Sequence, residues 1–231
     1  MDRLKLNSNQ LKLIAVVLMT LDHCAVVFLP VGTGFYLIRA FGRTVAPLMC
    51  YMIAEGYYHT SDLKKYMLRL FFAAAAAHIP YCLCFGYRLT EATDVLFSLL
   101  FGLIALAVSR YDGLNRPAKL LIILICCFAA YTSDWNYIAV LWVLGFGAFR
   151  DDRKKQLAAF LAVSALYFAQ GLLFGRLLWY RFGVLLTLPL LLLYSGGRGR
   201  RSKWIKWGFY IYYPAHLLII FLIAKGLNIY V

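Results

Sequence analysis

Long apolar runs, separated by short and mostly basic segments, fill this sequence from end to end. About nine of them approach the roughly 20 residues that an α-helix needs to cross the hydrocarbon core of a bilayer. They lie near residues 11–30, 36–58, 66–87, 95–109, 118–132, 135–149, 157–175, 181–195 and 208–226. The fourth, fifth, sixth and eighth runs are short enough to be tilted, re-entrant or internally buried, so eight to ten spans is the predicted range. The pattern predicts one all-α domain over residues 1–231, a polytopic helical bundle integral to a membrane.

The composition excludes a water-soluble globular protein. Hydrophobic residues make up 63% of the 231 residues, charged residues make up 15%, and the mean hydropathy is +0.74. Polar side chains are therefore too few to cover a surface in water. The net charge of +14 would suggest nucleic-acid binding in a soluble domain, so the placement of the basic residues decides what that charge means.

The basic residues follow the topology of a membrane protein. When alternate loops are assigned to the side of the N-terminus, that side holds 18 of the 24 lysines and arginines. They are Arg3, Lys5, Lys12, Lys64, Lys65, Arg69, Arg110, Arg116, Lys119, Arg150, Arg153, Lys154, Lys155, Arg198, Arg200, Arg201, Lys203 and Lys206. The positive-inside rule predicts a cytoplasmic N-terminus and an external C-terminus. We therefore expect membrane lipids with anionic head groups, and no nucleic acid, as partners of these segments.

The cysteines and one histidine give no indication of a metal site. All six cysteines lie within apolar runs, so they indicate neither a secreted disulfide framework nor a paired zinc motif. His78 and Cys82 share one predicted helical face, where packing or a helix contact is a simpler interpretation than metal binding. No metal is predicted.

Ionisable residues inside the apolar runs are the main indication of function. Each of them costs several kcal/mol in lipid unless it faces the bundle interior, a partner or water. The chain has more of them than packing requires, namely Asp22, His23, Arg39, Arg43, Glu55, His59, His78 and His216. We expect some of these side chains to line an internal site.

Helical geometry limits which of these residues can cooperate. Asp22 and His23 are adjacent, so their side chains point about 100° apart and the carboxylate is poorly placed to orient the imidazole. We expect Asp22 to pair with Arg43 of the next span and to leave His23 free for a reacting group. An ion pair that only ties the first two helices together is the structural alternative.

The second span carries two further features. Gly42 and Pro47 lie on either side of Arg43 and predict a kink there. Glu55 and His59 are one helical turn apart, so the carboxylate can hold the imidazole.

Five stretches place these polar residues in a fixed order along the chain. They are "LKLIAVVLMTLDH" (11–23), "RAFGRTVAPLMCYMIAEGYYHTSDLKKYMLRL" (39–70), "DVLFSLLFGLIAL" (94–106), "SDWNYIAVLWVLGF" (133–146) and "FYIYYPAHLLIIFLI" (209–223). In this order they resemble the pattern of the TraX family. The resemblance implies a bacterial inner-membrane acyltransferase, because the family's namesake is associated with N-terminal acetylation of conjugative pilin. The group also looks like a distant relative of the larger membrane acyltransferases that modify sugars and cell-surface polymers.

The resemblance also implies site residues. The family's polar positions fall on Asp22, His23, Arg39, Arg43, Glu55, Thr60, Arg69, Asp134, Tyr213, Pro214 and His216. The sequence departs from the family pattern at Ala46, where an aromatic residue is usual, at Asp94, where asparagine is expected, and at "DWN" (134–136), which replaces a triplet similar to Asp-Tyr-Gly. These differences concern the acceptor more than the reaction.

Acyl transfer suits these residues chemically. Acetyl-CoA is the expected donor, and the expected acceptor is an amine or hydroxyl of a small protein, a peptide or a glycan. A base must take the acceptor's proton and a cation must stabilise the oxyanion. We expect His23 to be the base or a transient acyl carrier, Arg43 the oxyanion or carboxylate clamp, and Asp22 the group that positions it.

The remaining site residues are expected around the donor. We expect Glu55, His59 and His216 near the inner mouth, with His216 facing Glu55 and His59 on the approach to His23. Arg39, His59, Arg69, Asp134 and Tyr213 complete the substrate-binding set. Pro214 is expected to bend the start of the last helix. A proton-coupled transporter and a non-catalytic assembly factor for pili or envelope proteins remain alternatives, because both would also bury polar residues.

Overall fold

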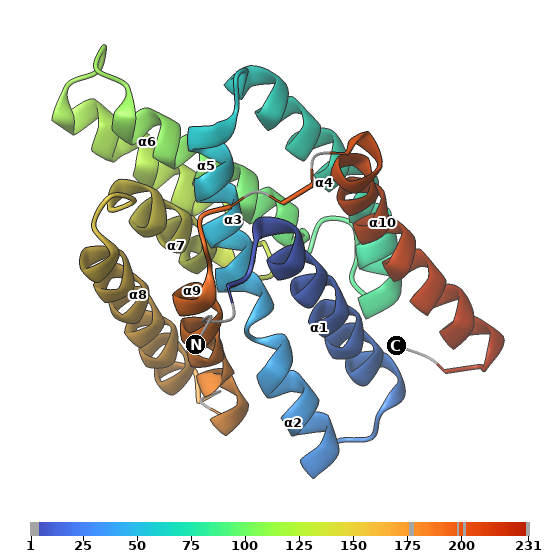
Figure 1. The fold of residues 1–231 in the computed structure, drawn as a ribbon. Coiled ribbons are helices and arrows are strands. Elements are labelled where there is room, and N and C mark those ends of the chain that lie inside the picture. The colour runs from blue at the N-terminus through green and yellow to red at the C-terminus, as the bar shows by residue number, and fades with distance from the viewer. Residues whose placement is uncertain (1–4, 176–177, 198, 201, 230–231) are drawn as a thin grey trace.

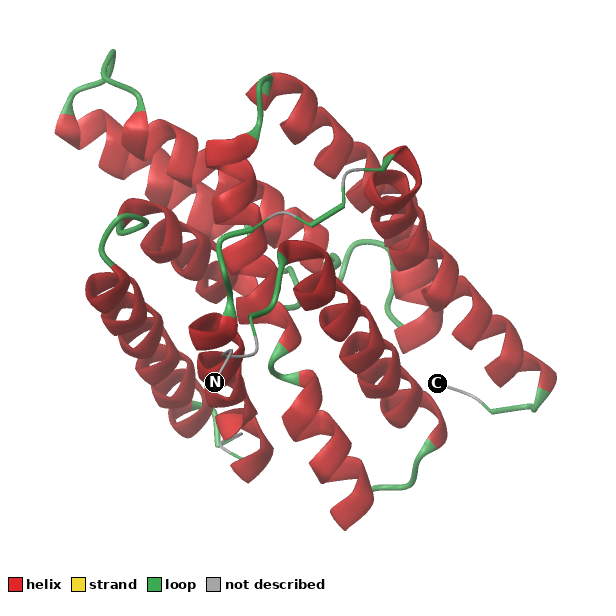
Figure 2. Ribbon diagram, viewed as in Figure 1, coloured by secondary structure: helices red, strands yellow, loops and turns green. Residues whose placement is uncertain are grey.

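The structure is a computed structural model that describes residues 5–175, 178–197, 199, 200 and 202–229. These residues form α-helices, one 3-10 helix and no strand (Figure 1; Figure 2). The elements are α1 (Ser8–Phe28), α2 (Thr33–Gly42), α3 (Val45–His59), α4 (Leu63–Phe85), α5 (Val95–Arg110), α6 (Arg116–Ala129), α7 (Asn136–Ala148), α8 (Arg153–Leu173), η1 (Trp179–Leu186), α9 (Thr187–Leu193) and α10 (Lys203–Gly226). The predicted all-α class is confirmed.

Helix length separates two kinds of segment. Among the described residues, five segments are long and apolar enough to cross a membrane, namely α1, α2 together with α3, α4, α8 and the part of α10 from Trp207 to Gly226. The helices α5, α6 and α7 and the pair η1 and α9 are shorter, which matches the four runs predicted to be short. The chain is a helical membrane protein, while the number of nine spans and the cytoplasmic N-terminus stay predictions.

Side-chain caps explain where several helices begin. The Asn7 side-chain oxygen accepts from the backbone N–H of Gln10, and the Asn7 backbone N–H donates to the Gln10 side-chain oxygen, which is a capping box. Asp62, Asp94, Asn115 and Asp152 cap α4, α5, α6 and α8 in the simpler way. The Lys65 backbone N–H bonded to Asp62 keeps the pKa of that carboxyl below its usual value. Polar residues between apolar runs therefore set the helix starts.

The predicted kink at Arg43 is a break between two helices. Helix α2 ends at Gly42, and α3 begins at Val45. The Thr44 hydroxyl donates to the Gly183 carbonyl at 3.3 Å, and η1 packs against α2. A Cβ at Gly183 would collide with the backbone carbonyl of Ala40, so only glycine allows this approach. The break is therefore held by η1, a segment about 140 residues away in sequence.

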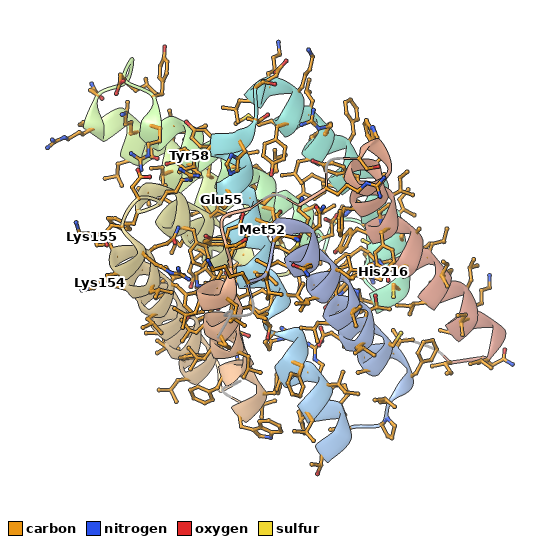
Figure 3. All side chains as sticks on the ribbon, viewed as in Figure 1. Met52, Glu55, Tyr58, Lys154, Lys155 and His216 are labelled. Carbon is orange, nitrogen blue, oxygen red and sulfur yellow. The ribbon has the colours of Figure 1, made fainter. Side chains whose placement is uncertain are left out.

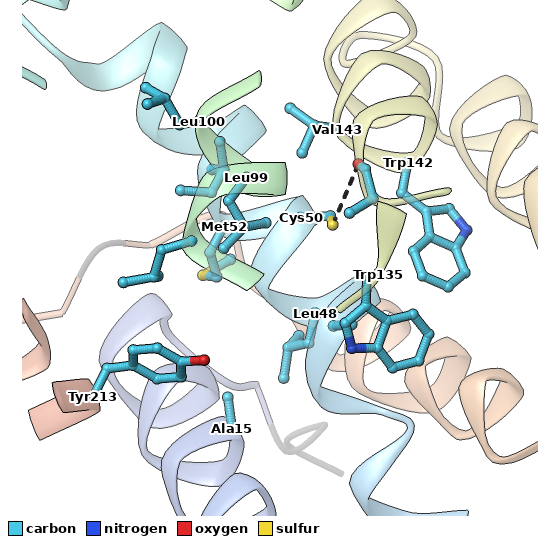
Figure 4. Packing of buried hydrophobic residues seen from close by; sticks show 14 of the residues in the cluster. Ala15, Leu48, Cys50, Met52, Leu99, Leu100, Trp135, Trp142, Val143 and Tyr213 are labelled. Atoms are coloured by element: carbon cyan, nitrogen blue, oxygen red, sulfur yellow. Dashed lines mark hydrogen bonds between the residues drawn. The ribbon is translucent and has the colours of Figure 1, made fainter. Parts of the chain in front are cut away.

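Helices α3, α5 and α7 form the centre of the core. Cys50, Leu99, Trp142 and Val143 are buried where the three helices meet (Figure 4). The Cys50 thiol donates to the Ala139 carbonyl at 3.5 Å. Helices α5 and α7, with 16 and 13 residues, are covered by their neighbours, which explains how such short elements are accommodated.

One end of the bundle gathers the basic segments. Leu6 bonds to the Leu193 carbonyl, Arg153 bonds to the Leu191 carbonyl, and Arg150 forms an ion pair with Glu55. The segment before α1, the last turns of α3, the connection between α7 and α8 and the end of α9 therefore lie together. Arg110 at the end of α5 joins them through the carbonyls of residues 147 and 148. Arg3, Arg198 and Arg201, and the side chains of Lys203 and Lys206, lie outside the described residues.

Helix α10 begins earlier than predicted. It starts at Lys203 rather than near residue 208, so Pro214 lies well inside the helix. The prediction that Pro214 bends only the start of this helix is wrong. A proline at this depth removes the backbone donor that would reach the carbonyl four residues before it, at Tyr210.

Candidate functional site

A buried carboxylate joins two arginines beside the α2–α3 break. Asp22 Oδ2 accepts from Arg39 at 2.7 Å and from Arg43 at 3.1 Å. The predicted Asp22–Arg43 pair is confirmed, and Arg39 adds a second cation that was predicted only as a substrate-binding residue. A Cβ at Gly42 would collide with the Asp22 carboxylate, so this glycine makes room for the pair.

Aromatic rings cover the guanidinium groups. The Arg43 guanidinium lies 4.8 Å from the Trp135 ring centre and 5.9 Å from that of Tyr180. The Arg39 guanidinium lies 5.8 Å from the same Tyr180 ring. Aromatic faces stabilise an arginine side chain without neutralising its charge, so the Arg43 guanidinium stays a cation. Neither ring was predicted from the sequence; a tryptophan directly after Asp134 was the available signal.

The Asp22 carboxylate does not orient His23. The hydrogen-bond partner of the His23 ring is His216 of α10. His216 Nε2 lies 2.9 Å from His23 Nδ1. The edge of the Phe85 ring also packs against the His23 ring at a centroid distance of 5.2 Å. His216 is only 5% exposed, so the expectation that it faces inward is confirmed. His23 is not wholly free for a reacting group, because His216 occupies one ring nitrogen.

A small cavity lies beside these groups. It measures about 80 Å³, and Asp22, His23, Arg43, Asp134, Trp135 and Tyr213 line it. These residues come from α1, from the α2–α3 break, from the segment before α7 and from α10. The fold therefore brings together His23, Asp22, Arg43, Asp134 and Tyr213 of the predicted site.

A second, larger cavity opens at the basic end. It measures about 830 Å³, and its polar lining includes Lys12, Glu55, His59, Lys65, Arg69 and Arg200. Both cavities share the apolar lining residues Met49, Leu96, Leu99 and Phe209, so they adjoin each other across a layer of apolar side chains. The size of the larger cavity is typical of a site for an organic ligand.

Glu55 belongs to the larger cavity and has two partners. His59 lies 3.4 Å from it one turn along α3, as predicted, and Arg150 lies 3.0 Å from its other oxygen. Arg150 was not predicted; a buried carboxylate near a basic loop was the only signal for it.

The expected contact of His216 with Glu55 and His59 is wrong. His216 contacts His23 instead, and Figure 3 shows Glu55 on α3 and His216 on α10 as separate groups. The physical reason is that α10 packs against α1 and α4, whereas the end of α3 meets the α7–α8 connection. The predicted residues thus form two groups, one around each cavity; Arg39 and His216 line neither cavity and join the smaller one through Asp22 and His23.

The histidine outside these groups has a structural contact. His78 Nε2 lies 2.9 Å from the Leu89 carbonyl oxygen in the segment after α4, and the His78 ring packs against Phe97 of α5, which agrees with the packing interpretation. Within the described residues no group of three or more His, Cys, Asp or Glu side chains could hold a metal ion, and all six cysteines are free.

Comparisons with known proteins identify the family of the chain. The family described as TraX protein matches residues 7–224, which include both groups. A relative from Dichelobacter nodosus, "Probable fimbrial assembly protein FimC, serogroup H1", is 32% identical, and the match covers 91% of this chain and 93% of the relative. No solved structure matches. The chain belongs to the TraX family.

Proposed function

We propose that this chain is an acetyltransferase that moves an acetyl group from acetyl-CoA to an amine or hydroxyl at the membrane. The observation that carries the proposal is the pair of adjoining cavities. The larger one, at the basic end, can hold a phosphorylated donor, and the smaller one holds a histidine beside a buried arginine.

The larger cavity suits the donor. Lys12, Lys65, Arg69 and Arg200 reach its lining from three separate segments and can pair with the phosphates of CoA. Glu55 and Asp62 add negative charge to the same wall, so phosphates are expected on the side of the basic residues. The apolar residues between the cavities would surround the pantetheine arm, and a space of about 80 Å³ suits an acetyl-sized group.

The smaller cavity suits the transfer step. His23 takes the proton from the acceptor as its nitrogen or oxygen attacks the thioester carbonyl. Arg43 stabilises the oxyanion of the tetrahedral intermediate, and its charge persists because guanidinium stays protonated. Collapse of the intermediate breaks the C–S bond, and the proton passes from His23 to the sulfur of CoA. Asp22 holds both Arg39 and Arg43 in place for this step.

The acceptor is proposed to belong to a pilus. The relative from Dichelobacter nodosus is named a probable fimbrial assembly protein, and a pilus subunit offers an amine at its N-terminus. An envelope glycan hydroxyl is the second acceptor to be tested.

The basic end is proposed to face the cytoplasm in a bacterial inner membrane, where acetyl-CoA is available. A green fluorescent protein fused to the C-terminus should then stay dark, and alkaline phosphatase at the same position should be active. The opposite result would place the larger cavity on the external side and remove its access to the donor.

Turnover of radiolabelled acetyl-CoA by the purified protein in nanodiscs tests the function. We expect release of free CoA, accelerated by a synthetic pilin N-terminal peptide or a glycan acceptor, with label in the acceptor. Proton-coupled flux in liposomes without any CoA binding would favour the transporter alternative. Absence of binding, turnover and flux would favour the assembly-factor alternative.

A further inference from the structure

The contact between His23 and His216 has a defined hydrogen-bond direction. His216 Nδ1 lies 3.0 Å from the Tyr212 carbonyl oxygen, and His216 Nε2 lies 2.9 Å from His23 Nδ1. A carbonyl oxygen only accepts, so His216 Nδ1 carries a proton. In a neutral His216, Nε2 is then the acceptor, and His23 Nδ1 must donate. The proton of a neutral His23 is thereby fixed on Nδ1, and its Nε2 is left bare.

The surroundings favour the neutral form of this pair. Asp22 is the nearest carboxylate along the chain, and its Oδ2 already accepts from both Arg39 and Arg43. That carboxylate is therefore not free to balance the charge of a protonated imidazole. No ion pair with a carboxylate is found for either imidazole in the described part of the chain, so a second buried cation would be uncompensated there.

A second cross-helix bond fixes the ring positions. The Thr20 hydroxyl has one proton, and it donates this proton to the Val16 carbonyl. In the contact between Thr20 Oγ1 and the Tyr212 hydroxyl, at 2.5 Å, Tyr212 is therefore the donor. Thr20 and His23 on α1 meet Tyr212 and His216 on α10 in the same order, so the two helices run parallel at this point. The Tyr212 ring stacks on the His216 ring at 5.1 Å, which holds the imidazole in one plane.

The second ring nitrogen of His23, Nε2, belongs to a side chain that lines the small cavity. His23 lines this cavity, and its Nε2 has no hydrogen bond to any described protein atom. A bare ring nitrogen beside a cavity is the group that accepts a proton in general base catalysis.

We propose that His216 is a positioning residue that keeps His23 in the Nδ1–H tautomer and presents the bare Nε2 to the small cavity. The inference rests on the proposed function only for the source of the proton. When Nε2 takes a proton from the acceptor, His23 becomes an imidazolium whose Nδ1–H still donates to His216. No group has to rotate, and the proton leaves from Nε2 to the sulfur of CoA.

The tautomer can be measured without any substrate. Nitrogen NMR of ¹⁵N-histidine-labelled protein in nanodiscs distinguishes protonated from bare ring nitrogens, and loss of a signal in His23→Gln assigns it. We expect His23 with a protonated Nδ1 and a bare Nε2. In His216→Leu the acceptor is gone, so the Nε2–H form of His23 should appear. In His216→Gln the side-chain oxygen replaces the lost acceptor and should keep the original tautomer.

The same variants separate this inference from the proposed function. With acetyl-CoA turnover established, His216→Leu should lower kcat about 10- to 100-fold at an unchanged KM, and His216→Gln should recover most of the activity. His78→Leu is the matched control, because His78 also contacts a carbonyl but lies outside both cavities. Full turnover in His216→Leu, or a His23 tautomer unaffected by that change, overturns the inference and leaves the function standing. The expected tautomers without any turnover would instead reject the acetyltransferase and retain the positioning role.

Discussion

Replacing Asp22 by alanine should lower the free energy of unfolding by about 3–5 kcal/mol, the cost of removing one partner from a buried ion pair. The Asp22 side chain is 7% exposed, and the side chains of Arg39 and Arg43 are 16% and 13% exposed. Both guanidinium groups would lose their counter-charge together. The aromatic faces of Trp135 and Tyr180 contribute about 0.5–2 kcal/mol each at such sites and cannot replace a carboxylate.

Thermal unfolding in detergent, followed by tryptophan fluorescence, measures this loss. Asp22→Asn should lose less, because its amide oxygen still accepts from the guanidinium groups. Asp151→Ala is the matched control: its carboxylate lies 3.7 Å from Arg150 but is 92% exposed, so its removal should change stability by less than about 1 kcal/mol. If Asp22→Ala unfolds at the same temperature as the wild type, the two arginines find other partners. The ion pair with Asp22 then does not stabilise the fold.

Much of the fold was predictable because hydropathy and helix-breaking residues act locally. The order of the apolar segments, the short central helices and the break beside Arg43 all follow from runs of apolar residues and from Gly42. The capping of α4 by Asp62 likewise depends on neighbours only three residues away. Contacts one turn apart, such as Glu55 with His59, were predictable for the same reason.

Neighbouring helices were harder to predict, because a span in lipid shows which residues are apolar but not which helix they face. His23 and His216 are 193 residues apart, and no periodic pattern relates α1 to α10. Asp22 illustrates the limit: charge complementarity identified Arg43 as a partner, but it could not show that Arg39 shares the same oxygen. The position of Pro214 was misjudged because the basic residues before it suggested a loop where α10 has already begun.

His23→Ala should lower kcat for acetyl transfer by about 100- to 10,000-fold, the usual contribution of a positioned general base. The large effect is expected because His23 is the histidine whose ring lines the small cavity in the described structure, and its replacement leaves the acceptor's proton without a base. Binding of acetyl-CoA should change little, since the polar residues proposed to hold the donor line the larger cavity. The KM for acetyl-CoA should therefore stay near the wild-type value.

The same variant distinguishes a base from an acyl carrier. If His23 is only the base, label from acetyl-CoA should not remain on the wild-type protein when the acceptor is absent. Label retained in the wild type and lost in His23→Ala would show an acyl-enzyme at Nε2, the nitrogen that His216 leaves free. His78→Ala, a histidine outside both cavities, should turn over normally in either case. Turnover in His23→Ala within about threefold of the wild type would assign the base to another group of the small cavity, where Asp134 is the remaining carboxylate not paired with an arginine in the described contacts.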